Sequence, residues 1–147
     1  MLKVGMAGAG FMARMHAECL RLIPEARIIG VTGGGPERAQ EFAAKYHCDY
    51  YPNLDALLSE GDPDMVDLCT PTDLHSSQAL TAAKAGKHIF CEKPIALTLE
   101  EAEAMIQAGR EAKVKFMVAQ VLRFWPEYTA IHDFVASGRL GKVLWAS

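Results

Sequence analysis

Met1-Leu-Lys-Val-Gly-Met-Ala-Gly-Ala-Gly-Phe-Met-Ala13 is the stretch that decides the fold predicted for this sequence. A short apolar strand over residues 2–7 runs directly into Gly8-x-Gly10-x-x-Ala13, and a helix is expected to follow. Gly8 allows a tight turn, Gly10 has no Cβ to block a phosphate, and Ala13 lets the helix lie close on the sheet. The free N–H groups and the partial charge of about +0.5 at the helix N-terminus favour a bound anion.

This spacing, between a strand and a helix, is typical of a site for the pyrophosphate of a dinucleotide. We predict that the loop and the first helical turn bind the cofactor through Gly8, Gly10, Phe11, Met12 and Ala13. The alternative is an ordinary tight connection that binds nothing. A Walker-type phosphate loop is excluded because no Gly-Lys-Ser/Thr follows Gly10. A methyltransferase is disfavoured because residues 4–7 carry no acid before the glycines.

Length and composition indicate one globular domain of ordinary size. The 147 residues are 50% apolar and 22% charged, with a formal net charge of −3, so nothing draws the chain electrostatically to nucleic acid or membrane. No charged leader precedes the first strand, and no apolar run nears the ~20 residues that span a bilayer. We expect a cytoplasmic protein without nucleic-acid or membrane partners. The four cysteines are widely spaced and the histidines form no ligand pair, so free thiols and no metal site are expected.

Strand and helix patterns alternate along the remaining chain. Further strands are expected at residues 26–31, 48–51, 65–69, 88–91 and 116–120, with helices between them. Two helix faces are expected to be apolar: Met12, Met15, Cys19 and Leu22 on the first helix, and Leu99, Ala102 and Ile106 on the helix capped by Thr98. Apolar strands separated by helices predict an α/β fold with a doubly wound parallel sheet, a Rossmann domain, over residues 1–122.

The carboxyl ends of parallel strands meet at one edge of a sheet, where a doubly wound fold binds its cofactor. Five loops should therefore line one crevice. They are residues 8–13, 32–35, 70–75, 92–94 and 120–123.

At this edge the sequence closely resembles the N-terminal domain of the Gfo/Idh/MocA family, named for glucose–fructose oxidoreductase, inositol dehydrogenase and rhizopine catabolism. The resemblance covers essentially the whole chain. It rests on Gly-Ala-Gly-Phe-Met-Ala at 8–13, Pro-Glu-Arg-Ala at 36–39, Cys-Thr-Pro-Thr-Asp-Leu-His at 69–75, Ala-Gly-Lys-His-Ile-Phe-Cys-Glu-Lys-Pro-Ile-Ala at 85–96 and Arg-Phe-Trp-Pro-Glu-Tyr at 123–128. The Glu-Lys-Pro loop is its most specific part.

The resemblance implies hydride transfer between a nicotinamide cofactor, NAD(P), and a carbohydrate or polyol substrate, with Lys93 as the catalytic residue near the reacting oxygen. An ammonium group can hydrogen-bond or protonate a developing alkoxide. The alternative for Lys93 is a surface side chain paired with Glu92. Family members often hold the following proline, here Pro94, in a cis peptide.

The resemblance also places other residues at the cofactor. Thr70, Pro71 and His75 resemble the wall beside the nicotinamide, and Glu92 and Gln120 belong to the same loops. For His75 the alternative is a residue at a helix start that is held by local hydrogen bonds.

The sequence departs from the family at the end of the second strand. An acid commonly binds the adenosine ribose there, about 20 residues past the glycines, but this chain has Thr32-Gly33-Gly34-Gly35. The open amides of Gly33 and Gly34, the Thr32 hydroxyl and Arg38 could hold a 2′-phosphate instead, which favours NADP. The alternative is that Arg38 is solvated and that NAD is bound through backbone contacts.

The sequence also ends early compared with the family. A helix over residues 126–137, closed by Gly138, leads in the family to an antiparallel sheet that binds substrate and forms the oligomer interface. We expect residues 123–147 to be the connecting helix and first strand of a truncated substrate domain. Apolar side chains left without partners could drive self-association, so a homo-oligomer stays open.

Two functional hypotheses follow. The first is an NAD(P)-dependent oxidoreductase, present here as its cofactor-binding half and inactive alone. The second is a stand-alone dinucleotide-binding module or sensor without catalysis.

Overall fold

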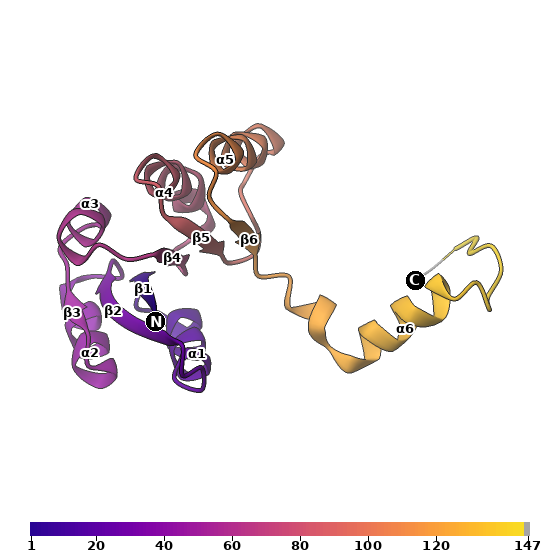
Figure 1. The fold of residues 1–147 in the computed structure, drawn as a ribbon, viewed down its shortest axis with the longest axis horizontal. Helices are drawn as coiled ribbons and strands as arrows, with labels where there is room; N and C mark the ends of the chain where they lie inside the picture. The colour runs from indigo at the N-terminus through magenta and orange to yellow at the C-terminus, as the bar shows by residue number, and fades with distance from the viewer. Residues whose placement is uncertain (146–147) are drawn as a thin grey trace.

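Six parallel strands lie side by side in the order β3-β2-β1-β4-β5-β6 (Figure 1). The computed structural model describes residues 1–145. Its elements are β1 (Leu2–Ala7), α1 (Phe11–Leu20), β2 (Ala26–Thr32), α2 (Pro36–Tyr46), β3 (Asp49–Tyr50), α3 (Leu54–Ala56), the π-helical turn η1 (Leu57–Gly61), β4 (Met65–Leu68), α4 (Thr72–Lys84), β5 (His88–Cys91), α5 (Leu99–Glu111), β6 (Phe116–Val118), the 3₁₀ turn η2 (Val121–Phe124) and α6 (Pro126–Ala136). The predicted doubly wound α/β sheet is confirmed.

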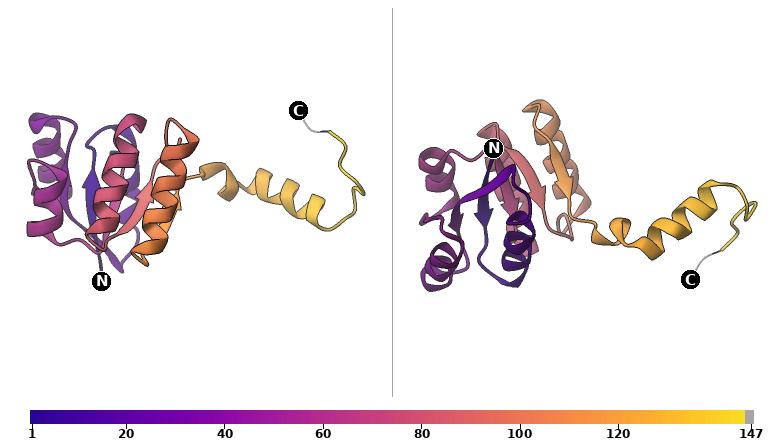
Figure 2. Two further views of the ribbon diagram at one scale, coloured as in Figure 1. Left: turned by 90° about the horizontal axis from the view of Figure 1, so that it is seen from above. Right: turned by 60° about the horizontal axis from the view of Figure 1, so that its bottom comes forward.

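Helices lie on both faces of the sheet. α1 and α2 lie on one face, and α3, α4 and α5 lie on the other (Figures 1 and 2). The chain passes from β1 to β2 on one side and later returns to β4 on the other, so the strand order reverses between β1 and β4. Ligands of doubly wound sheets bind at the carboxyl ends of the strands beside such a reversal. The loops after β1 and β4 are therefore at the centre of the expected crevice.

Two apolar cores, one on each face of the sheet, follow from the alternation of side chains along the strands. On the α1 and α2 face, Val4 and Met6 of β1 pack with Phe42 of α2. On the opposite face, Val66 and Leu68 of β4 belong to a separate cluster. Between those two residues of β4, Asp67 must therefore point to the α1 face, where it is 1% exposed.

The apolar face predicted for α1 is wrong. Ala13 and Ala17 are its buried residues, whereas Met15 is 46% exposed and Leu22, beyond the end of the helix, is 83% exposed. The small alanines let the helix approach the sheet closely. The side of α1 that carries Met12 and Met15 consequently faces strands β4–β6. No helix of the described residues covers these strands on the α1 face (Figure 1).

The apolar face predicted for α5 is also wrong. Leu99 is 78% exposed, and the buried residues are Met105 and Gly109. Gly109 lies so close to β6 that a Cβ there would be 3.3 Å from Cβ of Phe116. This close approach selects the face of α5 that packs, and it could not be read from the spacing of apolar residues.

Several local predictions are confirmed. Gly86 adopts φ 72° just after α4, Pro36 begins α2, and the hydroxyl of Thr98 accepts a hydrogen bond from the amide of Glu101 at 3.2 Å. These signals act within one helical turn, so they depend little on the rest of the fold. The outer strands β3 and β6 are shorter than predicted, with two and three residues.

α6 points away from the sheet, and none of its residues is buried (Figure 2). Gly138 follows it with φ 73°, as expected for a helix end. The strand expected over residues 141–147 is not formed in residues 141–145, and residues 146–147 lie outside the described part. A strand needs a neighbour for its backbone hydrogen bonds, and this segment has none among residues 1–145. Within the same residues, no helix has the length and apolar character needed to cross a bilayer.

Candidate functional site

Gly8 is the residue that lets the loop after β1 fit between its neighbours. Its φ is +111°, and a Cβ there would lie 2.7 Å from the carbonyl oxygen of Cys69. Its amide donates a hydrogen bond of 2.7 Å to the carbonyl of Thr32 at the end of β2. Only glycine satisfies both the backbone conformation and the space, so Gly8 joins the ends of β1, β2 and β4 at one point.

Gly10 has a different role. Its φ of −80° and ψ of −164° suit any residue, and a Cβ there would meet no atom within 4 Å. The fold therefore does not need a glycine here, but the missing side chain leaves open space at the start of α1. Among residues 1–145, no side chain caps the first amides of α1, and Ala13 is fully buried against the sheet. Open space before uncapped helical amides is the geometry of an anion site.

The glycine loop after β2 lies against this site. Gly33, Gly34 and Gly35 all have positive φ, and a Cβ on Gly34 would be 3.2 Å from the amide nitrogen of Ala9. Thr32 is only 3% exposed, so its side chain lies in the interior. Arg38 is exposed on α2 and forms no ion pair with any described residue.

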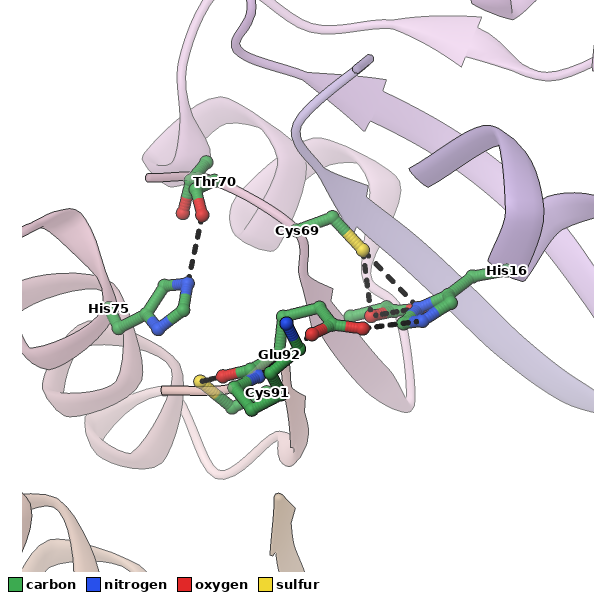
Figure 3. A network of polar contacts seen from close by, with 8 residues as sticks. His16, Cys69, Thr70, His75, Cys91 and Glu92 are labelled. Atoms are coloured by element: carbon green, nitrogen blue, oxygen red, sulfur yellow. Dashed lines mark hydrogen bonds and ion pairs between the residues drawn. The ribbon is translucent and has the colours of Figure 1, made fainter. Parts of the chain in front are cut away.

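His75 connects the loops that follow β4 and β5. Its ring is 1% exposed, and its Nε2 and Nδ1 lie 2.9 Å and 3.0 Å from the carbonyl oxygens of Thr70 and Pro94 (Figure 3 shows the contact with Thr70). The hydroxyl of Thr70 in turn donates to Gln78 at 2.6 Å. These contacts favour the interpretation of His75 as a residue held by local hydrogen bonds, while Pro71 beside it is exposed.

Lys93 is exposed at the end of β5, and its peptide bond to Pro94 is cis. Glu92 next to it is 7% exposed and does not pair with the ammonium group. Its Oε2 accepts a hydrogen bond from the backbone amide of Lys93 at 2.8 Å, and its Oε1 contacts Nε2 of His16 at 3.1 Å. Within residues 1–145, the ammonium of Lys93 has no carboxylate within 4.0 Å, so the interpretation as a surface ion pair with Glu92 is not supported.

A cluster around His16, absent from the sequence analysis, lies next to Glu92 (Figure 3). Nδ1 of His16 lies 2.9 Å and 3.1 Å from the carboxylate oxygens of Asp67, and the thiol of Cys69 donates to Asp67 at 3.3 Å. The sequence did carry a signal, because Asp67 is a lone acid inside an otherwise apolar strand. A buried carboxylate needs a partner, but nothing in the sequence indicated which residue supplies it.

The electrostatics of this cluster follow from its burial. Desolvation alone lowers the pKa of His16, but the hydrogen bond and charge of Asp67, together with Glu92, outweigh it and raise that pKa above its usual value. Burial, and then the charge and hydrogen bond of Asp67, raise the pKa of the Cys69 thiol. The ring of His16 therefore keeps its proton to a higher pH than a free imidazole does, and the thiol of Cys69 keeps its proton to a higher pH than a free thiol does.

Three atoms of the cluster, from His16, Asp67 and Cys69, lie within 4.8 Å of one another, as metal ligands would. Both ring nitrogens of His16 already contact carboxylates, and metal binding would require the thiolate of Cys69. We interpret the group as a hydrogen-bond network.

An apolar hollow of about 540 Å³ opens between α1 and the uncovered face of β4–β6. Phe11 and Met12 of the first helical turn line it together with Lys93, Phe90 and Met117. The first turn of α1 and the proposed catalytic lysine are thus neighbours at the same edge of the sheet. Gln120 is exposed at the end of β6, beside this edge.

The strand order of the sheet reverses between β1 and β4, and a glycine loop and the uncapped N-terminus of α1 lie beside this reversal. These features define a dinucleotide-binding Rossmann domain. The family model described as "Oxidoreductase family, NAD-binding Rossmann fold" (GFO_IDH_MocA) matches residues 2–120. The chain belongs to the Gfo/Idh/MocA oxidoreductase family, as the resemblance indicated.

Individual relatives support this membership. The chain is 36% identical over 142 residues to inositol 2-dehydrogenase of Rhizobium meliloti (strain 1021). The alignment covers 97% of this chain and 43% of that relative. The WlbA dehydrogenase of Bordetella pertussis, solved with NADH and UDP-GlcNAcA, is 27% identical with a TM-score of 0.93, covering 96% of this chain and 41% of that one. Biliverdin reductase of Synechocystis sp. PCC 6803, solved with biliverdin and NADP⁺, is 26% identical with a TM-score of 0.83. The match covers 92% of this chain and 43% of the reductase chain. The chain spans about two fifths of the length of these relatives.

Proposed function

We propose that this chain binds a nicotinamide dinucleotide and that Lys93 acts on the oxygen of a sugar or polyol in an NAD(P)-dependent oxidoreductase. The observation that carries the proposal is the open space at Gly10 in front of the uncapped amides of α1, a few residues from the hollow that Lys93 lines. A pyrophosphate placed there would accept hydrogen bonds from the amides of Phe11 and Met12. The inositol and UDP-sugar ligands named for relatives support the substrate class.

The cofactor fits the residues that are present. Gly10 leaves open space where the pyrophosphate would lie, while Gly8 and Gly34 let the loops after β1 and β2 pack closely against their neighbours. A bound nicotinamide would supply the carbon that gives or takes the hydride. The chain itself supplies the proton relay, because Lys93 can donate a proton to a carbonyl oxygen during reduction and can accept one from a hydroxyl during oxidation. All four cysteines are free thiols, which supports a reducing compartment such as the cytoplasm.

Thermal unfolding tests the binding proposal. NADH or NADPH at 100 times its Kd should stabilise the native chain by about 2.7 kcal/mol, seen as a rise in Tm. Gly10→Val should retain the fold, because the space around Gly10 is empty, and should lose the shift, because the branched side chain would occupy the place of the phosphate. Absence of a shift with millimolar amounts of both cofactors would contradict the proposal, and so would a normal shift in Gly10→Val.

We propose NADP as the preferred cofactor, on the basis of Arg38 and the glycine loop. Arg38 is exposed, has no described ion-pair partner and follows a loop that carries no acid to repel a 2′-phosphate. The neighbouring Glu37 places a negative charge in the same first turn of α2, and this charge opposes the binding of a 2′-phosphate. Thr32 supports this less than the sequence indicated, because its side chain is buried and its carbonyl is bonded to Gly8.

Titration calorimetry with NADPH and NADH tests the preference. Arg38→Ala should weaken NADPH binding by roughly 1.5–3 kcal/mol, the range for a hydrogen bond to a charged group, and should leave NADH binding unchanged. Arg27→Ala, at an exposed arginine near the amino-terminal end of β2 and so at the opposite end of the strand from Arg38, is a matched control that should change neither affinity. Equal losses for both cofactors in Arg38→Ala, or a wild-type preference for NADH, would assign Arg38 to the ordinary surface.

A further inference from the structure

A continuous line of contacts joins the interior of the sheet to the backbone of the proposed catalytic lysine. It runs from the carboxylate of Asp67 through Nδ1 and Nε2 of His16 to Oε1 of Glu92, at 2.9 Å and 3.1 Å. The other oxygen of Glu92, Oε2, accepts from the amide of Lys93 at 2.8 Å. Figure 3 shows His16 and Glu92 facing each other from α1 and the end of β5.

The two carboxylates that contact His16 are both buried. Asp67 is 1% exposed and Glu92 is 7% exposed, so the two carboxylates share a single imidazole in a poorly solvated place. Without His16, Asp67 would keep only the thiol of Cys69 as a donor and Glu92 only the amide of Lys93. A buried carboxylate with so few partners is strongly unfavourable, so His16 is what holds both acids in place. The ring of His16 is restrained on another side by Phe90, whose centroid lies 5.4 Å away.

The constraint reaches Lys93 because each oxygen of Glu92 has its own partner. His16 holds Oε1, and this contact orients Oε2 toward the amide of Lys93. If His16 were absent, the carboxylate would gain free energy by turning toward water, and the amide of Lys93 would lose its acceptor. The ammonium group itself has no ion pair within the described chain, so the backbone is what locates it.

We propose that His16 is a positioning residue for Lys93, acting through Glu92 and anchored by Asp67. This inference rests on the proposed role of Lys93 in the reaction. His16 is connected to Lys93 through Glu92, which accepts from the backbone amide of Lys93. It links α1 to the end of β5 and so fixes the start of the loop that carries the ammonium group. The N-terminus of the same helix faces the proposed pyrophosphate site.

Nuclear magnetic resonance of the 147-residue chain without nucleotide tests the proposal. The groups that face His16 are Asp67, Cys69 and Glu92, with Lys93 lining the same hollow. The ring carbons of His16 and the amide of Lys93 should shift with the same midpoint during a pH titration. An amide of Lys93 that stays unchanged while His16 titrates would overturn the proposal, and this result needs no variant.

Three variants separate positioning from a simple effect of charge. In His16→Gln, the amide of Lys93 should stop titrating and should exchange with solvent at least tenfold faster. In Glu92→Gln, His16 should still titrate, but Lys93 should follow with less than half of the wild-type amplitude. His132→Gln, at an exposed histidine of α6, should leave Lys93 unchanged. Wild-type protection of Lys93 in His16→Gln, or full amplitude in Glu92→Gln, would contradict the proposal.

The test is independent of the proposed function. A chain that fails to bind NADPH can still show the linked titration, which would leave His16 as the residue that positions this loop and would remove only the assignment of Lys93 to catalysis. A chain that binds NADPH without the linked titration would retain the proposed function and lose the role of His16.

Discussion

The 147-residue chain should show no measurable oxidation of sugars or polyols, even when NAD⁺ or NADP⁺ is bound. Hydride transfer needs the donor and acceptor carbons about 3–3.5 Å apart and aligned, and such positioning contributes roughly 7–11 kcal/mol to catalysis. Lys93 is an exposed side chain on one loop, and all of α6 is exposed. Nothing within residues 1–145 encloses a substrate over the lysine, so the chain lacks the groups that would orient a hydroxyl group.

A spectrophotometric assay of the reduced cofactor, run across a panel of sugars and polyols, checks this expectation. A longer protein that contains this chain is the positive control, and in it Lys93→Ala should reduce kcat far more than it weakens cofactor binding. In the short chain, Lys93→Ala should leave the thermal shift produced by NADPH intact. Robust turnover by the short chain would contradict the prediction, and an unchanged kcat in the longer variant would remove Lys93 from the mechanism.

Replacing His16 by alanine should destabilise the chain by about 3 kcal/mol at pH 6, because it leaves two buried carboxylates without their shared partner. The estimate takes the lower end of the range for broken buried pairs, since the side chain of His16 is 16% exposed. Urea unfolding followed by circular dichroism measures this loss. His132→Ala is the matched control, because that ring is 80% exposed and, in the part of the chain that the structure describes, its ion pair is with the exposed Asp133.

The same network gives the stability of the wild-type chain a pH dependence with a defined sign. The pKa of His16 is raised in the folded state above its usual 6.5, by Asp67 and Glu92 against the opposing effect of burial. The folded chain therefore holds a proton that the unfolded chain releases, and the stabilisation is complete below pH 6.5 and is lost as the pH rises through the folded pKa. Between pH 6 and 8, the difference in unfolding free energy between wild type and His16→Ala should shrink. A difference that stays constant or grows would contradict the raised pKa.

Much of the fold could be predicted because its signals are local. The apolar run of β1 followed by Gly8 and Gly10 predicts a strand, a tight turn and a helix within thirteen residues, and Thr98 and Gly86 mark helix ends in the same way. Each of these signals depends on the backbone of a few neighbouring residues. The alternation of such units then predicts a doubly wound parallel sheet, which the strand order confirms.

The contacts of the site were decided by the tertiary structure. His16 meets Asp67 and Glu92 across 51 and 76 residues of sequence, and only the order of the strands brings these three side chains to one face. For the same reason, Glu92 bonds to His16 and to a backbone amide, whereas the Glu-Lys dipeptide taken alone favours an ion pair between Glu92 and Lys93. The sequence by itself determined the elements and the loops that carry chemistry, because backbone preferences act over short distances. Burial determined which polar groups had to pair, because the free-energy cost of an unpaired charge arises only once the sheet and helices have assembled around it.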